Sequence, residues 1–112
     1  MTTLEAAEMR IIRILRDYLN DEETVITPDS CLCIQVGLDS LDIAGFLNDV
    51  EVAYGITVGD NDLAKFVSIN DPQCAGMPRW EVQQILTITH VALYVLRTVA
   101  LYNPSANGEE VK

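Results

Sequence analysis

Basic residues are scarce in this sequence, and their scarcity excludes one broad class of partner. The 112 residues include seven lysines and arginines against seventeen aspartates and glutamates, which gives a formal net charge of −10 at pH 7. Nucleic acids and anionic membrane surfaces are bound by clustered lysine and arginine, so we expect neither as a partner. The charge favours proteins that present basic patches, although acidity also serves solubility on its own.

Cysteine and histidine are few as well. The three cysteines, Cys31, Cys33 and Cys74, lack the density of a disulfide framework, and reduced thiols indicate a cytoplasmic protein. Together with His90 they lack the spacing of the usual zinc sites, so we expect no metal. With a single histidine in the chain, a serine-hydrolase triad would be hard to build. We therefore expect no serine-hydrolase chemistry.

The sequence also lacks a long uninterrupted apolar run. Its most apolar stretch, 85–101, is shorter than the roughly 20 residues of a membrane-spanning helix, and His90 and Arg97 interrupt it. The first residues, Met1 to Glu5, lack the basic start and apolar core of a signal peptide. We expect a core helix at 85–101 and no membrane span.

The pattern that is present is helical. Apolar residues recur at helical spacing in four segments, 2–19, 39–55, 60–66 and 80–102, the last with a bend near 87–89. These segments predict an all-α fold, a small bundle of four helices. Three of them are main helices, the one that is third in chain order is short, and a long loop follows the first. We expect one domain over 1–112 that ends in a flexible tail at 103–112.

Several local signals mark the ends of these helices. Thr2 with Glu5 has the form of a capping box, Asp39 is a good N-cap, and Gly55 is placed as a C-cap. The long loop carries isolated apolar residues that we expect to hold it against the helices: Val25, Ile26, Leu32 and Ile34.

One segment carries chemistry, Gly37-Leu38-Asp39-Ser40-Leu41-Asp42. It places Ser40 in the first turn of a helix, where an attached phosphate would face free backbone amides and the positive end of the helix dipole. Ser40 has no evident activating base of its own. A serine that another enzyme modifies needs exposure and a fixed backbone, and does not need a local base.

This motif resembles the phosphopantetheine attachment site of acyl carrier proteins. The resemblance covers most of the chain except 70–86 and the tail, and it also rests on Val50-Glu51, Tyr54-Gly55-Ile56, Asp60 to Phe66 and Thr87 to Val95. It implies a 4′-phosphopantetheine arm, transferred from CoA to Ser40, that holds acyl intermediates as thioesters. The resemblance further implies that the protein is not an enzyme but a non-catalytic carrier, which other enzymes modify and use. The implied pathways are fatty-acid, polyketide or related lipid synthesis.

The resemblance also implies how partners are recognised. Asp39 and Leu41 flank the modified serine, and Asp42, Asp49 and Glu51 would dock to basic patches. The implied partners are a phosphopantetheinyl transferase and acyl-loading, condensing or acyltransferase enzymes, and we expect a monomer. The chain departs from the family where it has Gly45, Val52 and Ala53 in place of further acidic residues.

Two other functions remain open from the sequence. One is a helical interaction module without a prosthetic group, and the other is a peptidyl or aryl carrier, although Asp39 resembles fatty-acid and polyketide carriers more. A calcium loop at 60–62 is rejected because the glycine and closing glutamate of such loops are missing.

The segment 70–86 is an insertion relative to the resemblance. The helix that follows is apolar on nearly every side, so it needs cover from the insertion, from a second protein or from an acyl chain. Ala44 and Gly45 are small enough to leave room between helices. We therefore expect an enlarged acyl pocket covered by Trp80, with self-association as the rival outcome.

Overall fold

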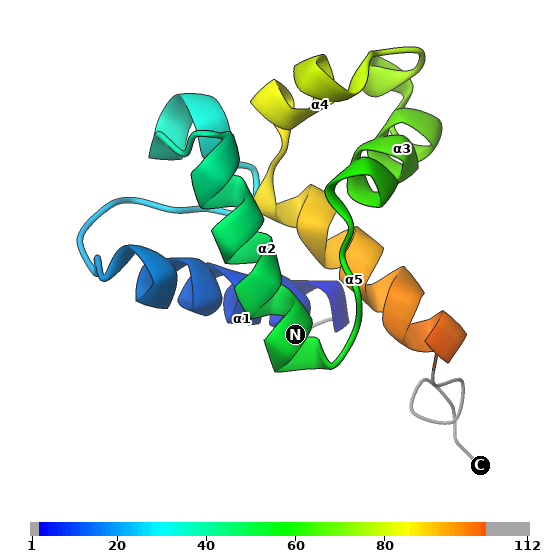
Figure 1. The fold of residues 1–112 in the computed structure, drawn as a ribbon. Helices are drawn as coiled ribbons and strands as arrows, with labels where there is room; N and C mark the ends of the chain where they lie inside the picture. The colour runs from blue at the N-terminus through cyan, green and yellow to red at the C-terminus, as the bar shows by residue number, and fades with distance from the viewer. Residues whose placement is uncertain (1–2, 103–112) are drawn as a thin grey trace.

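The structure, a computed structural model, describes residues 3–102, which form helices joined by loops (Figure 1). Within this range there is no β-strand, only an isolated bridge between Cys31 and Thr87. The expected all-α class is confirmed. In chain order the elements are α1 (Thr3–Leu19), the π-helical turn η1 (Leu32–Val36), α2 (Ser40–Tyr54), α3 (Asp60–Asn70), the 3-10 turn η2 (Pro72–Cys74), α4 (Arg79–Ile85) and α5 (Ile88–Tyr102).

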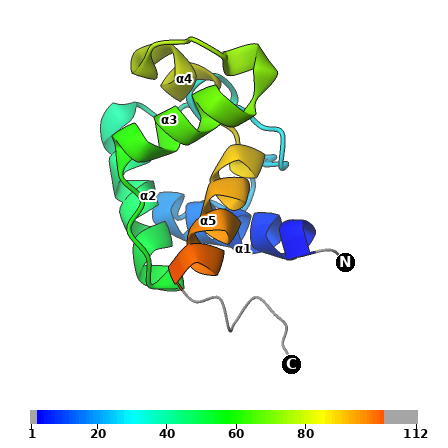
Figure 2. The ribbon, with the colours of Figure 1, turned by 90° about the vertical axis from the view of Figure 1, so that its right-hand side faces the viewer.

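The bundle is built on α1, which contacts both α2 and α5. Ala7, Ile11 and Leu15 lie four residues apart on α1, so they form one buried stripe on the face that meets its neighbours. The elements α3 and α4 lie together at the end of the molecule away from α1 (Figure 2). The expected capping residue Thr2 lies outside the described residues.

The last helix, α5, finds its cover inside the fold. Ile88, Val91 and Val95 are fully buried, and α5 contacts α1 on one side and α3 on another. Tyr94 meets Phe66 of α3 edge to face, with 5.4 Å between the ring centroids. Two helical neighbours therefore cover most of the apolar residues of α5, although Leu93 stays 42% exposed.

Residues 70–86 are more ordered than the sequence predicts. Helix α3 continues to Asn70, beyond the expected end near Phe66, and the expected loop 70–79 contains η2, whose Cys74 is fully buried. The helix expected over 80–102 is in fact two helices, because the chain leaves helical geometry at Leu86 and Thr87.

A capping box explains this break. The amide of His90 donates to Thr87 Oγ1 at 3.2 Å, and the amide of Thr87 donates to His90 Nδ1 at 3.1 Å. Histidine thus takes the place that glutamate or glutamine usually has three residues after the cap. With its first turn satisfied in this way, α5 begins at Ile88 as a helix of its own.

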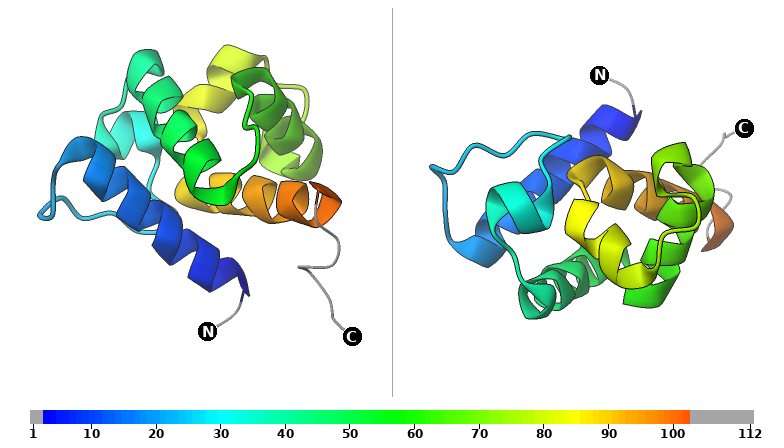
Figure 3. Two further views of the ribbon diagram at one scale, coloured as in Figure 1. Left: turned by 60° about the horizontal axis from the view of Figure 1, so that its bottom comes forward. Right: turned by 90° about the horizontal axis from the view of Figure 1, so that it is seen from above.

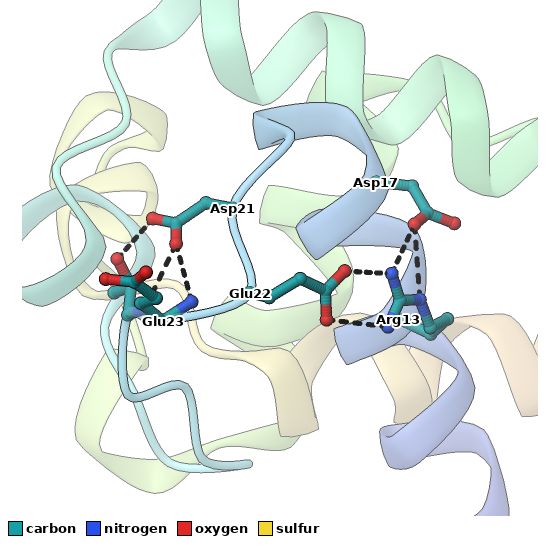
Figure 4. A network of polar contacts seen from close by, with 6 residues as sticks. Arg13, Asp17, Asp21, Glu22 and Glu23 are labelled. Carbon is teal, nitrogen blue, oxygen red and sulfur yellow. Dashed lines mark hydrogen bonds and ion pairs between the residues drawn. The ribbon is translucent and has the colours of Figure 1, made fainter.

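The long loop after α1 starts from a network of polar contacts (Figure 4). Arg13 bonds Asp17 at 2.7 Å and also pairs with Glu22, while Asp21 accepts from the amide of Glu23 at 2.8 Å. Farther along, Ile26 and Leu32 are buried as expected. The same prediction is wrong for Val25 and Ile34, whose side chains are 82% and 72% exposed.

Candidate functional site

Ser40 is the first residue of α2, and a capping box between Asp39 and Asp42 holds the backbone on either side of it. Asp39 is extended (φ −90°, ψ −178°) and caps the helix, with its carboxylate accepting from the Asp42 amide at 2.8 Å. The Asp42 carboxylate accepts in return from the Asp39 amide at 3.3 Å, which completes a capping box. The predicted N-cap at Asp39 is confirmed. Just before it, Leu38 is buried and its amide bonds Leu32 O at 2.9 Å.

The serine itself is open to solvent. Ser40 and Leu41 are both exposed, Leu41 to 78%. The amides of Ser40 and Leu41 belong to the first turn of α2, where backbone N–H groups have no acceptor within the helix. A phosphate carried on Ser40 would meet these amides and the positive end of the helix dipole. The residues present therefore fit a serine-linked phosphodiester.

Backbone hydrogen bonds hold the loop that precedes Ser40. In η1 the amides of Gln35 and Val36 both bond to Cys31 O, at 2.9 and 3.1 Å. Gly37 ends the turn in the left-handed region (φ 91°), which glycine adopts without steric cost. Figure 3 shows η1 beside α4 in the view from above, so the loop rests on the segment that follows α3.

The three acids predicted for docking differ in their surroundings. Asp42 is half-buried and accepts from the Tyr18 hydroxyl at 3.4 Å as well as from the Asp39 amide. Glu51 is also half-buried, and its carboxylate accepts from the Val58 amide at 2.8 Å, which holds the link between α2 and α3. Asp49 is exposed and lines a shallow groove of about 280 Å³ with Asp17 and Val52.

The charges near Ser40 are of one sign. Helix α2 contains Asp42, Asp49 and Glu51 and has no lysine or arginine, and Asp39 precedes it. Burial raises the pKa of the nearby Tyr18 phenol, and the carboxylates of Asp42, Asp39 and Asp49 raise it further. The surface around Ser40 is thus acidic without local neutralisation by α2 itself.

The small residues expected to leave room for an acyl chain have other surroundings. Ala44 is exposed, and a Cβ at Gly45 would lie 2.7 Å from the Tyr18 hydroxyl of α1. Trp80, expected to cover the pocket, is 60% exposed. The expected pocket is therefore wrong: Gly45 is small because Tyr18 packs against it. A hollow of about 400 Å³ lies instead between α3 and α5, beside Phe66.

The cysteines and the histidine are also arranged differently from the set considered in the sequence. Among residues 3–102, the group close enough to share an ion is Asp71, Cys74 and His90. His90 Nε2 lies 3.0 Å from Asp71 Oδ2, and its Nδ1 accepts the Thr87 amide. The neutral ring therefore carries its proton on Nε2 and donates it to Asp71. This arrangement is a hydrogen-bonded link between η2 and α5.

Comparison with known proteins identifies the family. The model of the phosphopantetheine attachment site matches residues 10–71, which include Ser40 and both caps of α2. The chain belongs to this family. Acyl carrier proteins of Rickettsia canadensis (strain McKiel) and Rickettsia typhi (strain Wilmington) are each 31% identical over 71 residues, which is 63% of this chain and 83% of the relative. No solved structure matches significantly.

The resemblance to acyl carrier proteins is thereby confirmed, and with it a covalently attached 4′-phosphopantetheine as the prosthetic group of the family. No helix in the described part of the chain has the length and apolar character needed to span a membrane. The match ends at Asp71, so η2, α4 and α5 lie beyond it.

Sequence reasoning missed three contributors to the site. Tyr18 approaches Gly45 and Asp42 from α1, and the thiols of Cys31 and Cys33 bond to α4. All three act between elements far apart in the chain. A signal for Tyr18 existed in Gly45, since a glycine inside a helix often marks a close approach.

Proposed function

We propose that Ser40 carries the phosphopantetheine arm and that the chain serves as an acyl carrier, a protein that other enzymes modify and use. The observation that supports this most is the combination at Ser40 of an exposed hydroxyl and a fixed backbone, inside the segment that matches the family model. When bound, the arm supplies a terminal thiol that holds an acyl group as a thioester.

The residues around Ser40 have different roles in the proposed function. Asp39 and Asp42 fix the helix start, and the first-turn amides of α2 favour the phosphate of the arm. Leu41, 78% exposed next to Ser40, offers an apolar contact to any enzyme that approaches. The transferase and the acyl-handling enzymes would meet acidic α2 with basic patches, and complementary charge speeds such encounters. Asp49 is the acid on α2 whose carboxylate is most available for this contact.

The remaining features of the proposal follow from composition and contacts. Three cysteines without the density of a disulfide framework are typical of a reducing compartment, so we propose a cytoplasmic protein. The core shared by α1 and α5 supports one domain, and we propose that it is monomeric. Fatty-acid, polyketide or related lipid synthesis is the proposed setting.

The direct test is attachment of the arm. Incubation with CoA and a phosphopantetheinyl transferase should increase the mass of the wild-type chain by one arm and leave Ser40→Ala unchanged. Ser68→Ala, a half-buried serine on α3, is the matched control and should be modified like the wild type. A wild-type chain that stays unmodified would favour an interaction module without a prosthetic group, and a modified Ser40→Ala chain would move the site elsewhere.

A further inference from the structure

The C-terminal end of α4 is capped by two thiols from a distant loop. Cys31 Sγ donates to Gln84 O at 2.7 Å and Cys33 Sγ donates to Gln83 O at 3.1 Å. The last carbonyls of a helix have few donors within it, and the two thiols add donors there: Gln83 O also accepts from the Leu86 amide at 3.4 Å. Between the two cysteines, the Leu32 amide donates to Leu86 O at 2.8 Å.

These three bonds join residues 31–33 to the C-terminal end of α4 and the residue after it. Helix α4 has seven residues, which is too short to be stable without tertiary contacts. Each thiol can donate only while it carries its hydrogen, so a disulfide or an alkylated sulfur cannot cap the helix. The two thiol bonds to α4 therefore exist only while both cysteines are reduced.

The same segment fixes the approach to Ser40. Leu32 O accepts from the amide of Leu38 at 2.9 Å, and Leu38 is buried two residues before Ser40. A change at 31–33 is thus transmitted over a short length of chain to the start of α2.

The geometry of the pair suits a bond between the two sulfurs. The sulfurs meet adjacent carbonyls at one end of α4, Cys31 Sγ at Gln84 O and Cys33 Sγ at Gln83 O, so the two side chains lie on the same side of their segment. Both cysteines are half-buried, whereas the third, Cys74, is fully buried. Burial raises the pKa of the Cys33 thiol, which disfavours Cys33 as the first nucleophile.

We propose that Cys31 and Cys33 form a thiol pair that a low-molecular-weight disulfide such as oxidised glutathione converts to an intramolecular disulfide, releasing α4 from η1. The thiolate of Cys31 attacks one glutathione sulfur and expels the other as glutathione thiolate. The Cys33 sulfur then attacks the mixed disulfide, forms the Cys31–Cys33 bond and expels the second glutathione. Two protein thiols and one glutathione disulfide thereby become one protein disulfide and two glutathione thiols.

Serine provides a matched control for this chemistry. In the double variant Cys31→Ser/Cys33→Ser each position keeps a hydroxyl donor for its carbonyl on α4, but no disulfide can form. In Cys31→Val/Cys33→Val both donors are removed without oxidation, so that variant should reproduce the oxidised state in reducing buffer.

The test combines mass spectrometry with amide hydrogen exchange in buffers of reduced or oxidised glutathione. We expect the oxidised wild type to lose two hydrogens at Cys31 and Cys33, and the Leu32 and Leu86 amides to exchange at least tenfold faster. The Ser/Ser variant should keep its protection in both buffers. Glutathione adducts without the intramolecular bond, or a Cys31–Cys33 disulfide with unchanged exchange at Leu32 and Leu86, would overturn the proposal.

A consequence for Ser40 rests on the proposed function. Oxidation should slow attachment of the arm at least threefold in the wild type and leave the Ser/Ser variant unaffected. Absence of attachment to the reduced wild type would count against the carrier function and leave the exchange result intact. Equal rates in the reduced and oxidised wild type would remove this consequence alone.

Discussion

The Asp42 carboxylate has two structural bonds at the place where the sequence predicts a docking charge. It accepts from the Asp39 amide and from the Tyr18 hydroxyl. Removing it should cost about 1 to 2 kcal/mol of unfolding free energy, because a helix cap and a side-chain bond are both lost. Asp42→Ala should show this loss in denaturant unfolding, while Asp42→Asn keeps an acceptor and should lose less. Asp49→Asn, at an exposed position, should change stability by at most about 0.5 kcal/mol.

Asp42→Asn and Asp49→Asn also separate a role in partner docking from a role in fold stability. If partners read the charge of Asp42, Asp42→Asn should slow arm attachment at low ionic strength and approach the wild-type rate as salt is added. A rate for Asp42→Asn equal to wild type at low salt would limit Asp42 to its capping role. The slower rate should then appear in Asp49→Asn, if α2 docks through its exposed acid.

Gly45 and Tyr18 are in close contact, so the effect of a substitution at one should depend on the side chain at the other. Alanine is favoured over glycine inside a helix by about 1 kcal/mol, but a Cβ at Gly45 would lie 2.7 Å from the Tyr18 hydroxyl. In the Tyr18→Ala background, Gly45→Ala should therefore stabilise the protein by about 1 kcal/mol. In the wild type the gain should be offset by displacement of the ring, so that the two effects differ by at least about 1 kcal/mol in a double-mutant cycle. Equal effects in both backgrounds would show that Tyr18 moves aside freely.

Among the elements, η2 and α5 are linked through Asp71 and His90. The hydrogen bond from His90, and next the amide of Gln73, hold the pKa of Asp71 below its ordinary value of 3.8. A carboxylate with a lowered pKa in the folded state stabilises the protein above its unfolded pKa, and this contribution is lost as pH falls through the folded value. Asp71→Asn should thus melt below the wild type at neutral pH, and the gap should close as pH falls below about 4.

The substitution His90→Glu should reverse the effect of Asp71→Asn on the melting temperature. In His90→Glu the glutamate keeps the acceptor for the Thr87 amide in the capping box, but it cannot donate to Asp71 and repels it. Adding Asp71→Asn in that background should raise the melting temperature. A lower melting temperature in both backgrounds would mean that Asp71 acts only through the η2 turn and not through His90.

The elements that the sequence predicts well are those with local signals. Asp39 and Gly55 announce the ends of α2 because capping geometry depends on a few adjacent residues. A bend near 87–89 was predicted, but not the complete break between α4 and α5, since the capping box there uses a histidine where the usual pattern has glutamate or glutamine. The exposure of Trp80 was also missed, because it depends on how α4 rests on its neighbours, which no local pattern encodes.

In the candidate site, too, features set by local sequence were predicted and features set by tertiary contacts were not. Ser40 and its caps follow from one hexapeptide, so their placement at the start of α2 was predicted. The different surroundings of Asp42, Asp49 and Glu51 were not, because the bonds to Tyr18 and to the Val58 amide depend on tertiary contacts. A periodic pattern shows that an acid lies on a helix, but not which backbone amide it reaches.

On the scale of the whole molecule, the family match and the folded core have different boundaries. The match covers 10–71, whereas α1 packs chiefly against α5, which begins at Ile88. Val91 and Val95 of α5 are fully buried together with Ile11 and Leu15 of α1 in one hydrophobic core. The segment with the attachment motif therefore depends on residues beyond it for its stability.

A fragment that ends at Asp71 should consequently fail to fold, although it contains Ser40 and both caps of α2. Losing three buried side chains of α5, Ile88, Val91 and Val95, removes about 5 to 9 kcal/mol of burial. That is comparable with the whole stability of a typical domain, about 5 to 15 kcal/mol. Circular dichroism with urea titration should show no cooperative transition for 1–71, and a clear one for 1–102, which keeps every described element. Cooperative unfolding of 1–71 would show that α1, α2 and α3 form a core that needs neither α4 nor α5.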